Sequence, residues 1–105
     1  MDNNVQREIL LSFFKVHILH HAAEEPVYGQ SILQELRRHG YDVSPGTIYP
    51  ILKRMESRGW LSVTGSERTS TKDRLEYVLT DEGRKILVDL REKVAELYEE
   101  VCLHK

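Results

Sequence analysis

The chain of 105 residues contains one cysteine, three prolines and no run of about 18 apolar residues. Its single thiol, Cys102, cannot form a disulfide within the chain, which fits a reducing cytosol. We expect no membrane span, because the longest apolar runs are too short. The opening Met-Asp-Asn-Asn lacks the basic segment of a secretory signal. These absences predict one small cytoplasmic domain with a modest core.

The motifs of enzymes are missing as well. No glycine-rich phosphate loop follows a strand, the serines lack a Ser/His/Asp setting, and Cys102 has no positioned base. His17, His20 and His21 include a pair spaced by four, which can share a metal on a helix. No cysteine or carboxylate lies at matching spacing, so we expect these histidines to be packed or hydrogen-bonded. The prediction is a protein without catalytic residues, cofactor or metal.

The net charge of −2 is unevenly distributed. Residues 37–74 hold eight Lys/Arg and four Asp/Glu, whereas residues 1–36 hold two and five, and residues 75–105 hold five and eight. Binding to a polyanion depends on the local field more than on the total charge. The central part of the chain is therefore the candidate for contact with nucleic acid.

A helix with two different faces is predicted within this positive part. Ser44 and Pro45 suit its cap and first position, and Gly59 suits its end. One face is apolar at spacings of three and four, with Ile48, Ile51, Leu52 and Met55. The other face carries hydroxyls and cations without an acid: Thr47, Tyr49, Lys53, Arg54 and Ser57. That chemistry fits a nucleic-acid groove.

Two helices are predicted before this one. Residues 5–23 form a helix that is apolar almost all round and ends at Glu24-Glu25-Pro26. Since such a helix must be buried on every side, its second face is expected to meet another subunit. A further helix over residues 28–39 stops at Gly40. With the short turn 41–43, it forms a helix-turn-helix whose second helix, 45–58, enters a major groove.

A hairpin and a long helix complete the predicted fold. Alternating residues in 61–64 and 75–79 indicate two strands around the polar loop 65–73. Thr80 then caps a helix that extends to about residue 103. Along this helix, apolar residues at coiled-coil spacing form a seam: Ile86, Leu90, Val94, Leu97 and Val101. The fold class is mainly α with a small β-hairpin: a winged helix-turn-helix over residues 1–79 and a dimerisation helix over residues 80–105.

Several segments resemble the PadR family of bacterial transcriptional regulators. They are Pro26-Val-Tyr-Gly29, Ser44-Pro-Gly-Thr-Ile-Tyr-Pro50 with Lys53-Arg-Met-Glu56, Gly59-Trp-Leu61, and Tyr77-Val-Leu-Thr-Asp-Glu-Gly83. The resemblance covers roughly residues 8–90. It implies a dimeric winged-helix repressor that binds a palindromic promoter. The short C-terminal part resembles the subgroup with a single C-terminal helix.

The resemblance also implies which residues face DNA. These are Ser44, Thr47, Tyr49 and Lys53 from the helix, with Lys72 and Arg74 from the wing; the residue pattern adds Arg54. Thr47 and Tyr49 are expected to read sequence, and the cations to contact phosphates. One departure concerns the wing, where Asp73 separates the two cations and would lie near phosphate.

The remaining expectations concern the dimer and its ligands. The predicted interface contains Ile9, Phe13, Leu90, Val94, Leu97 and Val101. An aromatic effector, which the resemblance permits, would bind beside Phe13, Phe14 and His17. A winged helix that binds an acidic protein partner is the alternative function. Pro50 lies inside the predicted recognition helix, and the sequence does not explain it.

Overall fold

The structure is a computed structural model that describes residues 3–64 and 75–103. Its elements in chain order are α1 (Asn3–Val5), the π-helix η1 (Gln6–Leu10), α2 (Leu11–Glu24), β1 (Val27–Tyr28), α3 (Gly29–Arg38), α4 (Pro45–Ser57), β2 (Leu61–Thr64), β3 (Glu76–Leu79) and α5 (Asp81–Cys102). None of the helices in these ranges is both long and apolar enough to cross a membrane.

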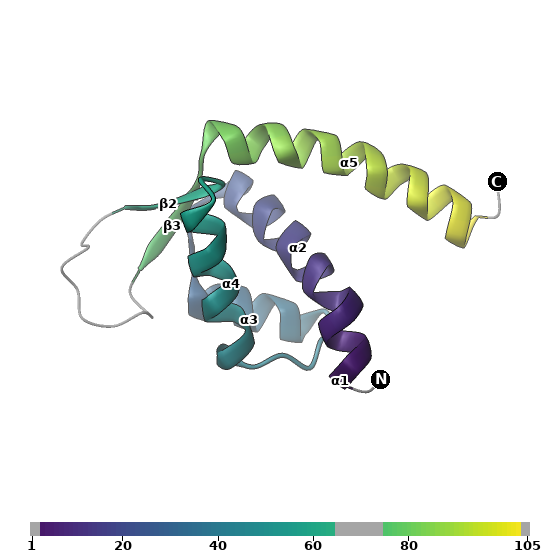
Figure 1. Ribbon diagram of the computed structural model, residues 1–105, viewed down its shortest axis with the longest axis horizontal. Coiled ribbons are helices and arrows are strands. Elements are labelled where there is room, and N and C mark those ends of the chain that lie inside the picture. Colours follow the sequence, from purple (N-terminus) through teal and green to yellow (C-terminus); the bar gives the residue numbers. More distant parts are fainter. Residues whose placement is uncertain (1–2, 65–74, 104–105) are drawn as a thin grey trace.

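Three helices and a small sheet surround one core, and a fourth long helix lies across them. In Figure 1, α4 lies between the sheet and α2, with α3 behind it. The long α5 starts at the end of β3 and continues beyond the other elements. This arrangement is a helix-turn-helix with an attached hairpin. The predicted fold class, mainly helical with a winged helix, is confirmed.

The sheet has three antiparallel strands in the order β1-β3-β2. The side chain of Glu76 on β3 accepts hydrogen bonds from both neighbours, from Tyr28 Oη at 3.2 Å and from Thr64 Oγ1 at 2.5 Å. The hairpin of β2 and β3 was predicted. Strand β1 was not, because its two residues pair with residues about fifty positions away and show no periodicity of their own.

The predicted helix boundaries rest on cap residues that the structure confirms. Gly40 and Gly59 have φ values of 97° and 86°, in the left-handed region that favours glycine. Thr80 caps α5 by accepting a hydrogen bond at 3.0 Å from the backbone N–H of Gly83. Local chemistry at these residues therefore fixes where α3, α4 and α5 begin or end.

The core is built from the inward faces of all these elements. Its fully buried side chains include Phe14, Ile18, Leu33, Ile48 and Leu52. The first helical segment has a second, open face: Ile9 is 52% exposed and Phe13 is 44% exposed. As predicted, the apolar surface of this segment exceeds what one small core can cover.

Helix α5 belongs to the core only at its beginning. Gly83 and Leu87 are buried, and Ile86 and Leu90 are partly buried. Residues 91–103 are all exposed. The predicted division at residue 79/80 therefore does not coincide with a break in packing, because the first turns of α5 complete the core of the preceding part.

Candidate nucleic-acid interface

The exposed face of α4 is the centre of the candidate interface. Ile48, Ile51, Leu52 and Met55 are buried, as predicted. Residues at spacings of four, three and four, which lie on one line of a helix, are all exposed: Gly46, Pro50, Lys53 and Ser57. Lys53 makes no hydrogen bond or ion pair with the residues that the structure describes. Its ammonium is available to a phosphate.

A groove borders one edge of this face. It is lined by the start of α4, the preceding turn and η1, and among its lining residues are Ser44, Thr47, Arg54 and Arg7. Ser44, Arg54 and Arg7 are exposed, and Thr47 is half-buried. The groove thus gathers two guanidinium groups and two hydroxyls, together with the carboxylate of Asp42. Arg7 was not predicted as a site residue, because a single arginine at the start of an apolar helix does not by itself indicate a binding site.

Tyr49 lies at the opposite edge and is held by α3. A Cβ built on Gly29 would meet Tyr49 Cε1 at 1.9 Å, so the tyrosine ring fills the space where any other side chain would stand. Tyr49 is half-buried, not fully exposed as the pattern suggested. Its ring is therefore fixed against the first residue of α3, and only part of it can reach DNA.

The α4 surface is less uniformly basic than the sequence pattern predicted. Glu56 is exposed on α4, so an acid does accompany Lys53 and Arg54. The guanidinium of Arg58 stands over the Trp60 ring, 5.8 Å from its centroid. This cation–π contact holds the Arg58 guanidinium beside Trp60, at the end of α4. The cations nearest the start of α4 remain those of the groove and Lys53.

Gly46 and Pro50 share an unusual place in α4. Pro50 is the sixth residue of the helix and offers no N–H to the carbonyl of Gly46, four residues earlier. A Cβ at Gly46 would meet only Ser44 Oγ, at 3.7 Å, which is ordinary contact. Nothing within the described residues thus requires a glycine at position 46. A molecule that approaches the backbone closely at this position would require one.

The wing can be assigned only in part. The predicted DNA contacts Lys72 and Arg74, and Asp73 between them, lie outside the described residues. The described base of the wing is the β2–β3 hairpin, which Glu76 joins to β1.

The end of α4 is tied directly to the start of α5. Thr80 Oγ1 donates a 2.6 Å hydrogen bond to the carbonyl of Gly59, and the Thr80 N–H donates to the carbonyl of Trp60 at 3.2 Å. A Cβ at Gly83 would lie 2.2 Å from that same Trp60 carbonyl oxygen. The segment that follows α4 and the start of α5 therefore meet through backbone atoms, which links the two helices at this point.

The predicted dimer residues form an open apolar surface on the single chain. Ile9, Phe13, Val94, Leu97 and Val101 are 44–60% exposed, and Leu90 is half-buried. The predicted effector residues do not share one environment. Phe14 is fully buried against Tyr41, with ring centroids 5.1 Å apart, whereas the neighbouring Phe13 lies on the surface and His17 is half-buried.

Comparisons with known proteins agree with this geometry. The model of the transcriptional regulator PadR-like family matches residues 18–89. The chain is 44% identical over 95 residues to transcriptional regulator Rv3488 of Mycobacterium tuberculosis, a match that covers 90% of this chain and 88% of that protein. A PadR-like transcription factor from Bacteroides fragilis has a TM-score of 0.75 at 28% identity, covering 98% of this chain and 100% of that one. A PadR-like regulator from Bacillus cereus gives 0.73 at 27% identity, covering 94% and 93%.

Proposed function

Because the chain belongs to the PadR-like family of transcriptional regulators, which bind DNA and catalyse no reaction, we propose that it is a homodimeric repressor of a palindromic promoter. The two α4 helices of the dimer enter successive major grooves on one side of the duplex. Two-fold symmetry then sets the half-site centres about one helical turn, roughly 34 Å, apart. The alternative of a winged helix for an acidic protein partner has no comparable support.

The observation that carries this proposal is the exposed face of α4. It combines Lys53, without a partner among the described residues, with a glycine that the fold does not need and a groove holding Arg54 and Arg7. Cations beside such a helix bind phosphates, and a glycine at the second position of α4 leaves room for the backbone to approach another molecule closely. Helix α4 thus has both the charge and the close-approach surface of a recognition helix.

Cations and hydroxyls take different parts in this proposal. Lys53 and Arg54 contact the phosphate backbone, and so do the wing cations Lys72 and Arg74, which lie outside the described residues. Ser44 and Thr47, at the beginning of α4, contact base edges or phosphates through their hydroxyls, since the N-terminal part of a recognition helix reaches deepest into the groove. Tyr49, held against Gly29, offers a fixed ring edge to one strand.

Dimerisation is supported by the amount of apolar surface left open. Val94, Leu97 and Val101 lie on one side of α5 at spacings of three and four, each about half exposed. Ile9 and Phe13 add to this surface from the first helical segment. A second copy of the chain would bury these side chains, at about 25 cal/mol per Å² of apolar area.

Release by an aromatic effector is the third part of the proposal. Phe13 is exposed on α2 and His17 follows one turn later, so a ligand at the dimer surface would contact both. Phe14 would act only by supporting the helix from the core. A ligand that binds one spacing of the two α4 helices more tightly shifts operator affinity by that difference.

Replacing Lys53 by alanine is expected to weaken binding to every DNA sequence. Each subunit of the bound dimer loses one phosphate contact, so the slope of log affinity against log salt concentration should fall by about 2, about 1 per subunit. Fluorescence anisotropy of a labelled operator fragment and of an unrelated fragment, from 50 to 200 mM salt, measures both quantities.

Lys85→Ala is the matched control, because Lys85 is equally exposed but lies on α5. This control should keep the affinity and the salt slope of the wild type. An unchanged slope in Lys53→Ala would show that this face of α4 does not lie on DNA.

A further inference from the structure

Two histidines of α2 and one at the end of α3 meet on the surface between these helices. His17 and His21 are one turn apart on α2, and His39 caps the C-terminus of α3. Each offers one ring nitrogen, and these three nitrogens all lie within 4.8 Å of one another. The His17 ring is 6.0 Å from that of His21 and 5.4 Å from that of His39, centroid to centroid.

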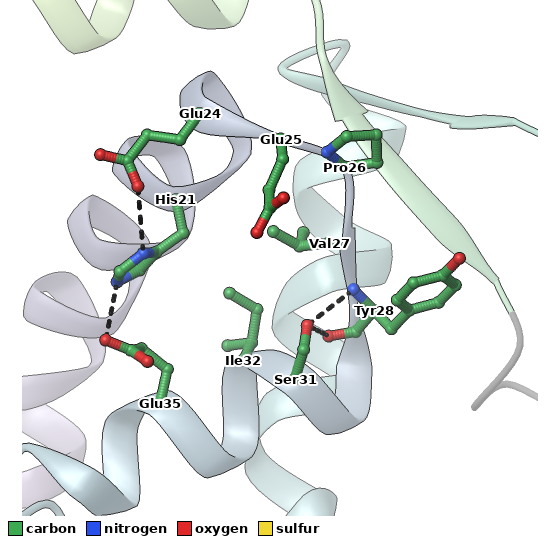
Figure 2. A pocket seen from close by; sticks show the side chains of 9 residues that line it. All are labelled: His21, Glu24, Glu25, Pro26, Val27, Tyr28, Ser31, Ile32 and Glu35. Carbon is green, nitrogen blue, oxygen red and sulfur yellow. Dashed lines mark hydrogen bonds and ion pairs between the residues drawn. The ribbon is translucent and has the colours of Figure 1, made fainter.

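The surroundings of these rings contain an unsatisfied polar atom. His21 Nε2 is buried and has no hydrogen-bond partner. The nearest carboxylate oxygen, Glu35 Oε2, is 3.7 Å away, beyond hydrogen-bond distance. Figure 2 shows His21 placed between Glu24 of its own helix and Glu35 of α3. A buried nitrogen without a partner costs free energy unless something else binds it.

A carboxylate lies next to one of the three histidines, as is common in metal sites. Glu35 Oε2 lies 3.0 Å from His39 Nε2, and the carboxylate also accepts a hydrogen bond from Arg38. That hydrogen bond is the main cause that lowers the pKa of Glu35, so its side chain is ionised at neutral pH. Metal-binding histidines commonly donate their second N–H to such a carboxylate, which orients the ring.

Two of the three histidines are shifted toward the form that binds a metal. Burial, with the neighbouring imidazoles, lowers the pKa of His17 below its usual value. Burial also lowers the pKa of His21, although Glu35 opposes this effect. Neutral imidazole is the ligand form, and three of them suit zinc and its neighbours among the divalent transition metals.

We propose that His17, His21 and His39 form a binding site for a divalent transition-metal ion of the zinc class, with Glu35 as the carboxylate that orients His39. A tetrahedral ion with metal–nitrogen bonds of about 2.0 Å needs its ligand nitrogens about 3.3 Å apart. Small rotations of the three rings bring them that close. Three protein ligands leave the fourth position to water, which the exposed side of His39 admits.

The site would join α2 to His39, the residue that follows α3. The turn to α4 begins directly after His39 and is itself held by a 3.0 Å hydrogen bond from Arg37 Nε to the carbonyl of Val43. A bound ion therefore fixes the helix-turn-helix to α2, on which the candidate dimer surface begins. Because it binds only the folded chain, the ion also raises the free energy of unfolding.

The experiment is a titration of the metal-free full chain with Co²⁺, whose visible absorption reports tetrahedral coordination. One Co²⁺ per chain is expected at micromolar concentration, displaced by Zn²⁺, and Zn²⁺ alone should raise the thermal midpoint. His39→Gln and His17→Gln should weaken Co²⁺ binding by at least about 100-fold, and Glu35→Gln by about 10- to 100-fold.

His20→Gln is the decisive control. His20 belongs to a second possible group with His21 and Glu24, but not to the three-histidine site. Glu24 lies four residues after His20, so the expectation that no carboxylate has a matching spacing was wrong. The control variant should keep the wild-type affinity and spectrum. Loss of binding in His20→Gln, or wild-type binding in His39→Gln with an unchanged circular dichroism spectrum, overturns the proposed ligand set. The absence of any Co²⁺ spectrum at micromolar concentration overturns the site. None of these readouts depends on DNA binding.

Discussion

Replacing Leu97 by glutamate is expected to convert the dimer into monomers and to abolish tight operator binding. Leu97 is 52% exposed on the single chain, in the middle of the α5 seam. In a dimer, the variant loses about 1 kcal/mol of burial from each subunit, because about half of the Leu97 side chain is already buried in the single chain, and gains two carboxylates in an apolar interface. Dimerisation should weaken at least about 1,000-fold. Sedimentation velocity at micromolar concentration measures the change.

Ala95→Glu introduces the same residue on the opposite side of α5, where Ala95 is exposed. This control should remain a dimer and keep operator affinity. Leu97→Glu should bind the operator at least about 100-fold more weakly, because a monomer presents one α4 helix in place of two. A wild-type chain that sediments as a monomer at micromolar concentration, or a Leu97→Glu chain that stays dimeric, contradicts the assigned interface.

Gly83→Ala is expected to be the most destabilising single methyl addition in the helix-turn-helix and its junction with α5. The new Cβ would lie 2.2 Å from the carbonyl oxygen of Trp60 and 2.7 Å from Leu79 Cδ1. The first contact is with backbone, so it cannot be relieved by a rotamer change. Overpacking of this kind costs about 1–3 kcal/mol or more. Urea unfolding followed by circular dichroism measures the loss.

Gly46→Ala is the matched control, and it separates folding from function. Its new methyl meets only Ser44 Oγ, at 3.7 Å. The free energy of unfolding should be unchanged or raised by up to about 1 kcal/mol, since alanine suits a helix better than glycine. Operator affinity should nevertheless fall by about tenfold, because the methyl stands on the face that approaches DNA. A variant that is as stable as the wild type and binds the operator as tightly would show that DNA does not closely approach Gly46.

Much of the fold could be predicted because its boundaries depend on local chemistry. Ser44-Pro45, Gly40, Gly59 and Thr80 each act within a few residues, so α3, α4 and α5 begin and end within about two residues of their predicted positions. The two strands of the wing could be predicted because apolar and polar residues alternate along them. The π-helical segment η1 was not, because its sequence, Gln-Arg-Glu-Ile-Leu, contains no signal for its hydrogen-bond pattern.

The features that sequence reasoning missed depend on contacts between distant residues. Tyr49 looked exposed by helical periodicity, yet Gly29, twenty residues earlier, provides the space that holds its ring. His39 completes a cluster with His17 and His21 only because α3 folds back along α2. Arg7 joins the groove beside α4 in the same way. Such contacts depend on how distant segments pack together, and they cannot be predicted from the pattern of a single sequence.

The most direct test of the central claim is guanine N7 methylation protection on an operator selected from genomic DNA. N7 lies in the major groove, so the method reports where the α4 helices sit. We predict two protected patches, their centres about 10 base pairs apart, and both should be lost in Leu97→Glu. A single patch, or a bound operator without any N7 protection, would contradict a dimer that places α4 in successive major grooves.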